Sequence, residues 1–147
     1  MILYAIFRVL CWFSLPTYYK RIRIIGKEHR IFSGPLILVS NHPNTMMDAL
    51  HVPFHLKQRI GFMANAGIFK NPVAAKIWRY LQVIPVYRKQ DLAKGERMDN
   101  TDSFRECYTF LDQGKTLMIL PEGSSISEMK LRPIKSGVAR IALEYQS

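Results

Sequence analysis

Short, largely apolar runs recur along this chain and predict β-strands. A run that is apolar throughout is typical of a strand buried on both faces, whereas strict alternation predicts a strand with one wet face. The apolar runs predict four strands, over Pro35–Ser40, Ile60–Ala64, Gln82–Tyr87 and Thr116–Leu120. The alternating segment Arg21–Ile24 predicts a further strand with one exposed face.

Helical patterns lie between these strands. Asn71 and Pro72 form a helix start signal, because Asn caps free N–H groups and Pro suits the first helical position, and this helix is expected to reach Leu81. Ser103–Glu106 has the spacing of a capping box and predicts a helix that ends near Gln113. Helices are also predicted over Met46–Leu56 and Gly137–Tyr145, and a mobile surface loop over Arg88–Asn100.

The alternation of strands and helices predicts an α/β domain. The expected sheet is largely parallel and mixed, is flanked by helices and is connected by right-handed crossovers. In such sheets, ligands bind beyond the carboxyl ends of the strands. Because His42, Arg88 and Glu122 each follow a predicted strand, all three are expected to face one crevice.

The first segment, Met1–Leu15, is apolar apart from Arg8 and Ser14. This run is shorter than the roughly 20 residues of a membrane-spanning helix. Arg8 inside the run, with Leu15-Pro16 at its end, argues against a signal peptide. Residues 1–19 are therefore predicted to form an interfacial helix on the cytoplasmic face of a membrane, with a core helix as the open alternative. The membrane interpretation rests on nearby aromatic and basic residues, Trp12, Phe13, Tyr18, Tyr19, Lys20, Arg21 and Arg23.

The charge of the 147-residue chain favours an anionic partner. It has 21 Lys and Arg against 11 Asp and Glu, a formal net charge of +10. Nucleic acid, an anionic membrane and a phosphorylated substrate are the usual partners of such an excess. No zinc-finger spacing, RNA-binding signature or recognition helix occurs, so nucleic acid is not expected. Two cysteines give no disulfide framework, and His51 and His55 lack the HExxH pattern, so no metal is expected.

His42 and Asp48 lie where a core strand ends, on a segment of turn residues. A neutral imidazole takes a proton from a hydroxyl, and a carboxylate fixes its tautomer and stabilises the imidazolium. Their separation is not a same-face helical spacing, so contact requires a turn at Pro43–Thr45, with Asp48 in the first turn of a helix. No Gly-x-Ser-x-Gly elbow occurs, so the attacking hydroxyl can belong to the substrate. On this segment alone, a plain polar loop is the alternative.

A second polar segment follows the last predicted strand. Pro121–Ser125 supplies a Gly and hydroxyls, and Lys130–Gly137 supplies cations. Backbone N–H groups of such a loop, together with Lys or Arg, form an anion-binding nest for which phosphate is a natural ligand. The alternative is an ordinary turn before a helix.

In this order, these segments resemble the motifs of the glycerolipid acyltransferases. The family's first block resembles Asn41-His42, a spacer and Asp48 in this chain. The family's second block resembles Val83–Arg88. The third is similar to Pro121–Ser125 with Pro133–Gly137 downstream, and the likeness covers Pro35 to Leu143. The resemblance implies a membrane-associated enzyme that acylates glycerol-3-phosphate or 1-acylglycerol-3-phosphate from acyl-CoA or acyl-carrier protein, without another cofactor.

The same resemblance implies roles for individual residues. His42 would be the general base and Asp48 its orienting carboxylate. The acceptor would be bound by a larger set, namely Asn41, Arg88, Glu122, Gly123, Ser124, Ser125 and Lys135. The acyl chain would approach along the membrane side, near the first helix.

Three departures from the family pattern qualify these expectations. The spacer between His42 and Asp48 is one residue longer than usual, and Ser125 stands where the family has Arg. Arg88, Lys130, Arg132 or Lys135 would have to replace that charge, which keeps another lysolipid acceptor open. The family's fourth block, a Val-Pro strand, does not follow Tyr145, so residues 20–147 are expected to be a truncated acyltransferase domain. A non-catalytic basic membrane-binding module is the remaining alternative.

Overall fold

The computed structural model describes residues 2–29, 33–44, 47–48, 52, 54–56, 59–88, 99–125 and 130–146. The strands are β1 (Leu36–Val39), β2 (Ile60–Asn65), β3 (Val83–Val86) and β4 (Thr116–Ile119). The helices are α1 (Ile2–Tyr18), α3 (Pro72–Tyr80), α4 (Thr101–Asp112) and α5 (Gly137–Gln146), with short 3-10 turns η1 (Lys27–His29) and η2 (Ala66–Phe69). The predicted α/β class is confirmed, and each of the four apolar runs forms a strand.

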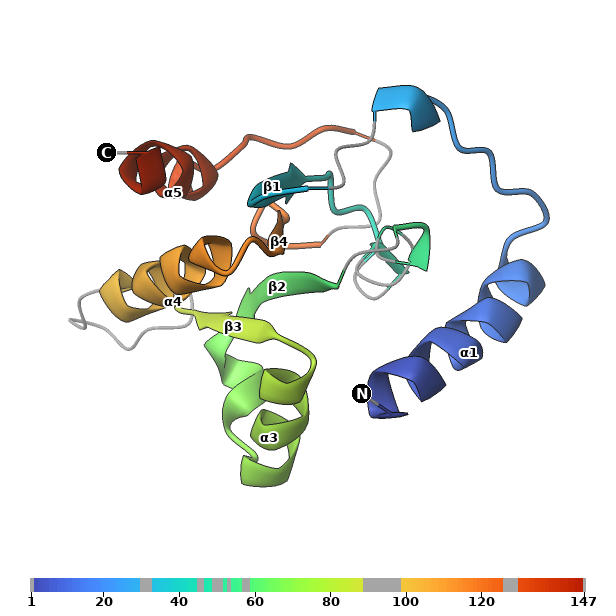
Figure 1. Ribbon diagram of the computed structural model, residues 1–147, viewed down its shortest axis with the longest axis horizontal. Coiled ribbons are helices and arrows are strands. Elements are labelled where there is room, and N and C mark those ends of the chain that lie inside the picture. Colours follow the sequence, from blue (N-terminus) through green and yellow to red (C-terminus); the bar gives the residue numbers. More distant parts are fainter. Residues whose placement is uncertain are drawn as a thin grey trace.

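The four strands form one sheet in the order β1-β4-β2-β3 (Figure 1). All pairs among the described strands are parallel, so the expectation of a mixed sheet is wrong for this part of the chain. Met118 of β4 is paired with Leu38 on one side and Phe62 on the other. An inner strand of a parallel sheet is covered on both faces, which is why every residue of β4 is buried.

The main hydrophobic core lies between the sheet and α4 with α5. Leu117 and Ile119 project from β4 toward Cys107 and Leu111 of α4, together with Ile84, Phe110 and Ile141. Burial raises the pKa of the Cys107 thiol to about 12, as expected of an inert core cysteine. Gly61 of β2 is required by close packing, since a Cβ there would lie 2.6 Å from the Phe110 ring.

One predicted strand and one predicted helix start are wrong. Arg21–Ile24 alternates between exposed and half-buried side chains as expected, but it forms no strand, because no described strand pairs with it. Helix α4 begins at Thr101 rather than at a Ser103 cap, and Ser103 is buried inside the helix. The Thr101 N–H is already satisfied by Asp99 Oδ1, at 2.8 Å, so the helix starts one turn earlier. Most of the predicted helix 46–56 and loop 88–100 lies outside the described residues.

The predicted N-terminal helix is present as α1, which lies apart from the sheet in Figure 1. Cys11 and Leu15, one turn apart, are buried. Other apolar side chains of α1 are exposed, namely Ile6, Val9, Leu10, Trp12 and Phe13. None of the described helices combines the length and apolar character needed to cross a membrane.

Candidate active site

A hydrogen-bonded histidine and aspartate follow β1. His42 Nδ1 lies 3.1 Å from Asp48 Oδ2, so the predicted contact is present. The Asn44 N–H donates to the same Oδ2 at 2.7 Å, and the Asp48 N–H donates to the Asn44 carbonyl at 3.1 Å. This turn brings two residues six positions apart into contact, and Asp48 is helical as expected. The longer spacer therefore does not prevent the pairing.

The hydrogen bonds constrain the protonation of the His42 ring. An ionised carboxylate only accepts hydrogen bonds, so Nδ1 is the nitrogen that carries the proton toward Asp48. Nε2 then holds the lone pair, as in the histidine of a Ser-His-Asp triad. The two side chains are 14% and 17% exposed, which leaves them accessible while limiting competition from water. The pair has the geometry of an oriented general base.

A second loop follows β4, the strand beside β1. Its residues Pro121 and Glu122 are buried, and Gly123 has a φ of 70°, the left-handed conformation that favours glycine. The Lys135 side chain crosses directly over Gly123, because a Cβ added there would lie 2.5 Å from Lys135 Nζ. The Lys135 N–H also donates to the Pro121 carbonyl at 3.0 Å. Lys135 is therefore held against this loop both by its backbone and by its side chain.

Two arginines bond to the same loop. Arg88 follows the outer strand β3, and its Nη1 donates to the Gly123 carbonyl at 2.9 Å. Arg132 Nη1 donates to Ser124 at two atoms, Oγ at 2.7 Å and the carbonyl at 3.2 Å. Together with Lys135, three cations from two segments of the chain meet at two adjacent residues. Among the described residues, neither Arg132 nor Lys135 forms an ion pair with a carboxylate.

The parallel sheet brings the predicted site segments to one edge. His42, Arg88 and Glu122 follow β1, β3 and β4, whose carboxyl ends all lie on that edge. The Ser40 N–H donates to the Ile119 carbonyl at 3.4 Å, which ties the first loop to the strand that precedes the second. Asn41 lies in the first loop, where its Oδ1 and carbonyl both accept from the Ser40 hydroxyl. Ser125 is half-buried at the end of the second loop.

Sequence reasoning gave Tyr19 no place near this site. Partial burial, the neighbouring Tyr18 and the charge of Asp48 raise the pKa of Tyr19, so its hydroxyl lies within electrostatic reach of that carboxylate. The end of α1 is therefore close to the His42–Asp48 pair. No pattern in the sequence indicates this, because Tyr19 stands in an ordinary run of aromatic and basic residues.

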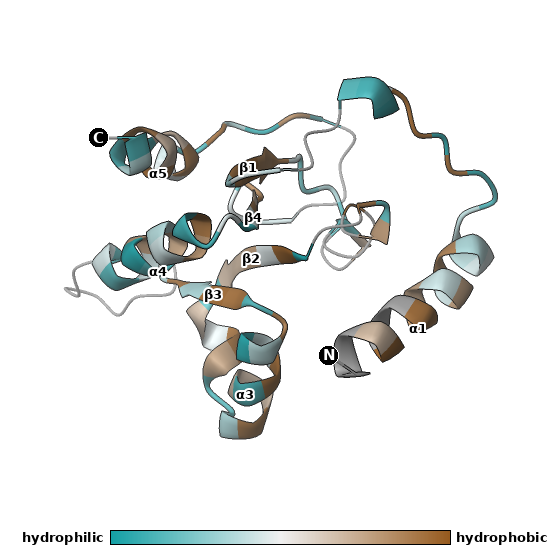
Figure 2. Ribbon diagram, in the orientation of Figure 1, coloured by the Kyte–Doolittle hydropathy of each residue, from teal (hydrophilic) through white to brown (hydrophobic). Residues whose placement is uncertain are grey.

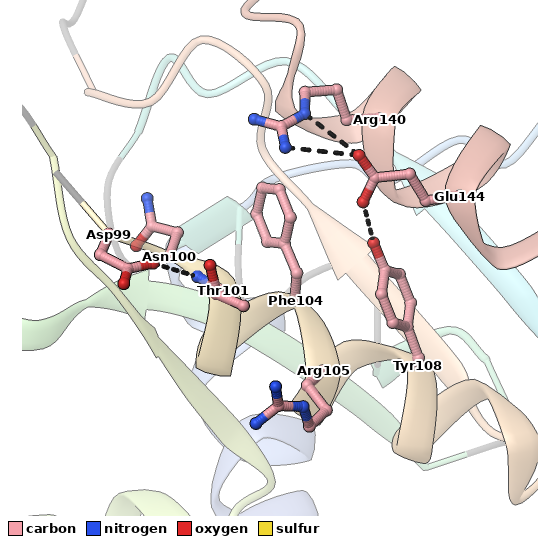
Figure 3. A pocket seen from close by; sticks show the side chains of 8 residues that line it. All are labelled: Asp99, Asn100, Thr101, Phe104, Arg105, Tyr108, Arg140 and Glu144. Atoms are coloured by element: carbon pink, nitrogen blue, oxygen red, sulfur yellow. Dashed lines mark hydrogen bonds and ion pairs between the residues drawn. The ribbon is translucent and has the colours of Figure 1, made fainter.

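A hollow lies elsewhere, between α4 and α5 (Figure 3). Its volume is about 480 Å³, and Phe104, Tyr108, Arg140 and Glu144 are among its walls. None of the residues of the two site loops lines it. No group of histidine, cysteine or acidic side chains in the described ranges is arranged to hold a metal ion. His51 lies outside those ranges.

Comparisons with known proteins place this geometry in context. Residues 21–147 match the family model described as Acyltransferase. The chain is 27% identical over 133 residues to 1-acyl-sn-glycerol-3-phosphate acyltransferase BAT2, chloroplastic, of Brassica napus, covering 89% of this chain and 36% of that protein. It is 26% identical over 133 residues to 1-acyl-sn-glycerol-3-phosphate acyltransferase LPAT1, chloroplastic, of Arabidopsis thaliana, covering 89% and 35%. The chain thus spans about a third of the length of these relatives. No solved structure matches it.

Proposed function

Because this chain belongs to the acyltransferase family, we propose that it transfers a fatty acyl group from acyl-CoA or acyl-carrier protein to a hydroxyl of a glycerol phosphate. The names of the two plant relatives favour 1-acylglycerol-3-phosphate as the acceptor, with glycerol-3-phosphate as the second candidate. This reaction belongs to phospholipid synthesis. The observation that carries the proposal is the His42–Asp48 hydrogen bond, because it leaves Nε2 as the base.

The reaction needs one proton acceptor and no covalent intermediate on the protein. His42 Nε2 removes the proton of the acceptor hydroxyl as the oxygen attacks the thioester carbonyl carbon. The negative charge of Asp48 stabilises the imidazolium that forms. When the tetrahedral intermediate collapses, the C–S bond breaks and the departing thiolate takes the proton from His42. The products are an ester and a thiol, and the base is restored.

The loop after β4 binds the acceptor phosphate in this proposal. Arg88, Arg132 and Lys135 supply positive charge, and the loop from Glu122 to Ser125 supplies hydroxyl and backbone groups. Both described hydrogen bonds of Arg132 use Nη1, so Nε and Nη2 have no partner among the described residues. A guanidinium with two remaining donor positions suits a phosphate, which accepts bidentate hydrogen bonds. Arg132 thus replaces the charge that is missing at Ser125.

The first helix brings the enzyme to its lipid substrate in the same proposal. The exposed apolar side chains of α1 contact the membrane, while Cys11 and Leu15 face the protein. Since Tyr19 at the end of this helix is close to Asp48, a lipid held along α1 has its head group near the base. The protein is therefore membrane-associated, at the cytoplasmic face.

A His42→Ala variant tests the reaction. Acyl transfer should fall by roughly a thousandfold, because general-base catalysis contributes about that much. The measurement is transfer of a radiolabelled acyl group from acyl-CoA or acyl-carrier protein to each acceptor, with circular dichroism as the control for folding. A folded variant with an undiminished rate would remove His42 as the base.

The acceptor panel also separates the alternatives. Lysophosphatidate and glycerol-3-phosphate are compared with neutral lysolipids, with wild-type protein throughout. Because Ser125 stands where the family has Arg, another lysolipid is an alternative acceptor. If the protein prefers such a lipid, that lipid replaces 1-acylglycerol-3-phosphate in the proposal. If wild-type protein acylates none of them but binds vesicles, the chain acts as a non-catalytic basic membrane module.

A further inference from the structure

Helix α3 carries an apolar stripe on its exposed face, although its Trp78 is half-buried. Val73, Ile77 and Tyr80 follow helical spacing and share one face, yet they are 70%, 43% and 46% exposed. The inward positions are held by Ala74, Ala75 and Trp78, which are half-buried. A surface helix normally has the reverse arrangement, with its apolar stripe toward the core. Figures 1 and 2 show α3 standing out from the sheet, with hydrophobic residues along it.

The apolar face continues toward the active-site edge. Helix α3 follows η2, whose Ile68 is also exposed, and η2 begins directly after the carboxyl end of β2. The carboxyl ends of β1 and β4 lie on the same edge, and they carry the loops of His42 and Gly123. The α3 face, defined as Ile68, Val73, Ile77 and Tyr80, therefore starts at the edge where the reaction is proposed.

Positive charge accompanies this face. Helix α3 contains no acidic residue, and Lys76 lies beside Val73 and Tyr80 on the helix surface. Lys70 precedes the helix, and neither lysine forms an ion pair within the described parts of the chain. Arg79 forms a long ion pair with Glu106, with 3.8 Å between Nη1 and Oε1. Exposed apolar residues beside uncompensated lysines are typical of a helix that lies on anionic lipid.

We propose that the α3 face is a membrane-docking surface for anionic lipid, separate from α1. The choice of lipid over a protein partner rests on the two unpaired lysines and on the proposed function, whose acceptor is a lipid. Docking through Val73 and Ile77 leaves Lys70 and Lys76 level with the head groups, where long side chains keep their charge in water. Two contact surfaces then fix the orientation of the sheet edge toward the bilayer.

A double variant, Val73→Ser with Ile77→Ser, tests the surface in the full chain. Flotation with phosphatidylcholine vesicles, with and without phosphatidylglycerol, measures affinity without any acyl transfer. Affinity should fall about tenfold, because two partly exposed aliphatic side chains no longer enter the lipid. Lys76→Gln should weaken binding about fivefold, and only to the vesicles that contain phosphatidylglycerol. The matched control is Leu143→Ser on α5, which is similarly exposed and should change nothing.

The outcomes distinguish this inference from the proposed function. Unchanged vesicle binding by the double variant, or equal loss by the Leu143 control, overturns the docking surface. Light scattering is measured in parallel, and a dimer that becomes a monomer without a change in vesicle binding also overturns it, in favour of a protein interface. If the wild-type protein transfers no acyl group, while the α3 variants bind vesicles less tightly than wild type, the docking surface is supported and the proposed enzyme activity is not.

Discussion

Two polar clusters of this molecule differ in how their charges are compensated. Between α4 and α5, Arg140 pairs with Glu144 at 3.3 Å, and Tyr108 donates to the same carboxylate at 2.5 Å (Figure 3). In the loop after β4, Arg132 and Lys135 bond to neutral groups or lie against glycine, and no described carboxylate pairs with either. The first cluster has a hollow of about 480 Å³ but carries balanced charge. The second carries positive charge that a ligand can neutralise.

We expect charge compensation, rather than the presence of a hollow, to distinguish a ligand site in this molecule. Paired groups already have the partners that replace water, so an incoming anion would have to break existing bonds. In the proposed function, the uncompensated cations Arg132 and Lys135 gain new partners when a phosphate binds. The clusters should therefore respond differently to matched substitutions.

Asp48→Asn, at the sheet edge that also carries the second cluster, should have the largest effect. The amide cannot stabilise the imidazolium of His42 by charge, so kcat should fall roughly a hundredfold or more with little change in KM. An amide oxygen can still accept from the Asn44 N–H, so the melting temperature should stay close to that of wild type. Steady-state kinetics with 1-acylglycerol-3-phosphate makes the measurement. An unchanged kcat would show that the carboxylate does not assist the base.

Arg132→Gln should have a smaller and more selective effect. A charge-assisted hydrogen bond contributes about 1.5–3 kcal/mol, so kcat/KM for a phosphorylated acceptor should fall at least about tenfold. The rate with monoacylglycerol, which lacks the phosphate, should not change. Equal losses with both acceptors would mean that Arg132 only supports the Ser124 loop.

The matched control for Arg132→Gln is Arg105→Gln in the other cluster. Arg105 lines the hollow between α4 and α5 and pairs with Asp102 at 3.0 Å. The same charge is removed there, but from an exposed ion pair, which contributes little to the stability of the fold. Acyl transfer should stay at the wild-type rate with both acceptors. A loss equal to that of the Arg132 variant would make overall charge, rather than position, the cause.

The strands and the α/β class were predictable from sequence because they depend on local patterns. Buried strands such as β4 are largely apolar, and Asn71 with Pro72 specifies a helix start through one side-chain acceptor and one missing N–H. The false strand at Arg21–Ile24 had the correct alternation, but a strand also needs a neighbour, which alternation does not specify. The Ser103 cap failed because α4 begins at Thr101, whose N–H is already satisfied by Asp99 Oδ1.

The candidate site was predictable as far as it follows strand ends. The contact of His42 with Asp48 could be expected from the turn residues between them, because only a turn joins positions six apart. That Arg132, among the four candidate cations, bonds to the Ser124 side chain could not be expected, since no local pattern specifies this contact. The exposed face of α3 also escaped prediction, because periodicity identifies an apolar face without saying which way it points.

Tyr108→Phe should have the smallest effect and involves only the balanced cluster. Loss of one exposed hydrogen bond should lower Tm by about 2 °C and leave acyl transfer unchanged. Partial burial, together with the hydrogen bond and charge of Glu144, raises the pKa of Tyr108 to about 12 from its ordinary value near 10. The fold thus favours the neutral phenol. The contribution of the Tyr108 hydroxyl to stability is therefore complete below about pH 10 and is lost as the pH rises toward 12. Denaturant unfolding across that range should show the two proteins converging in stability, whereas a constant difference would mean that the phenol acts only through packing.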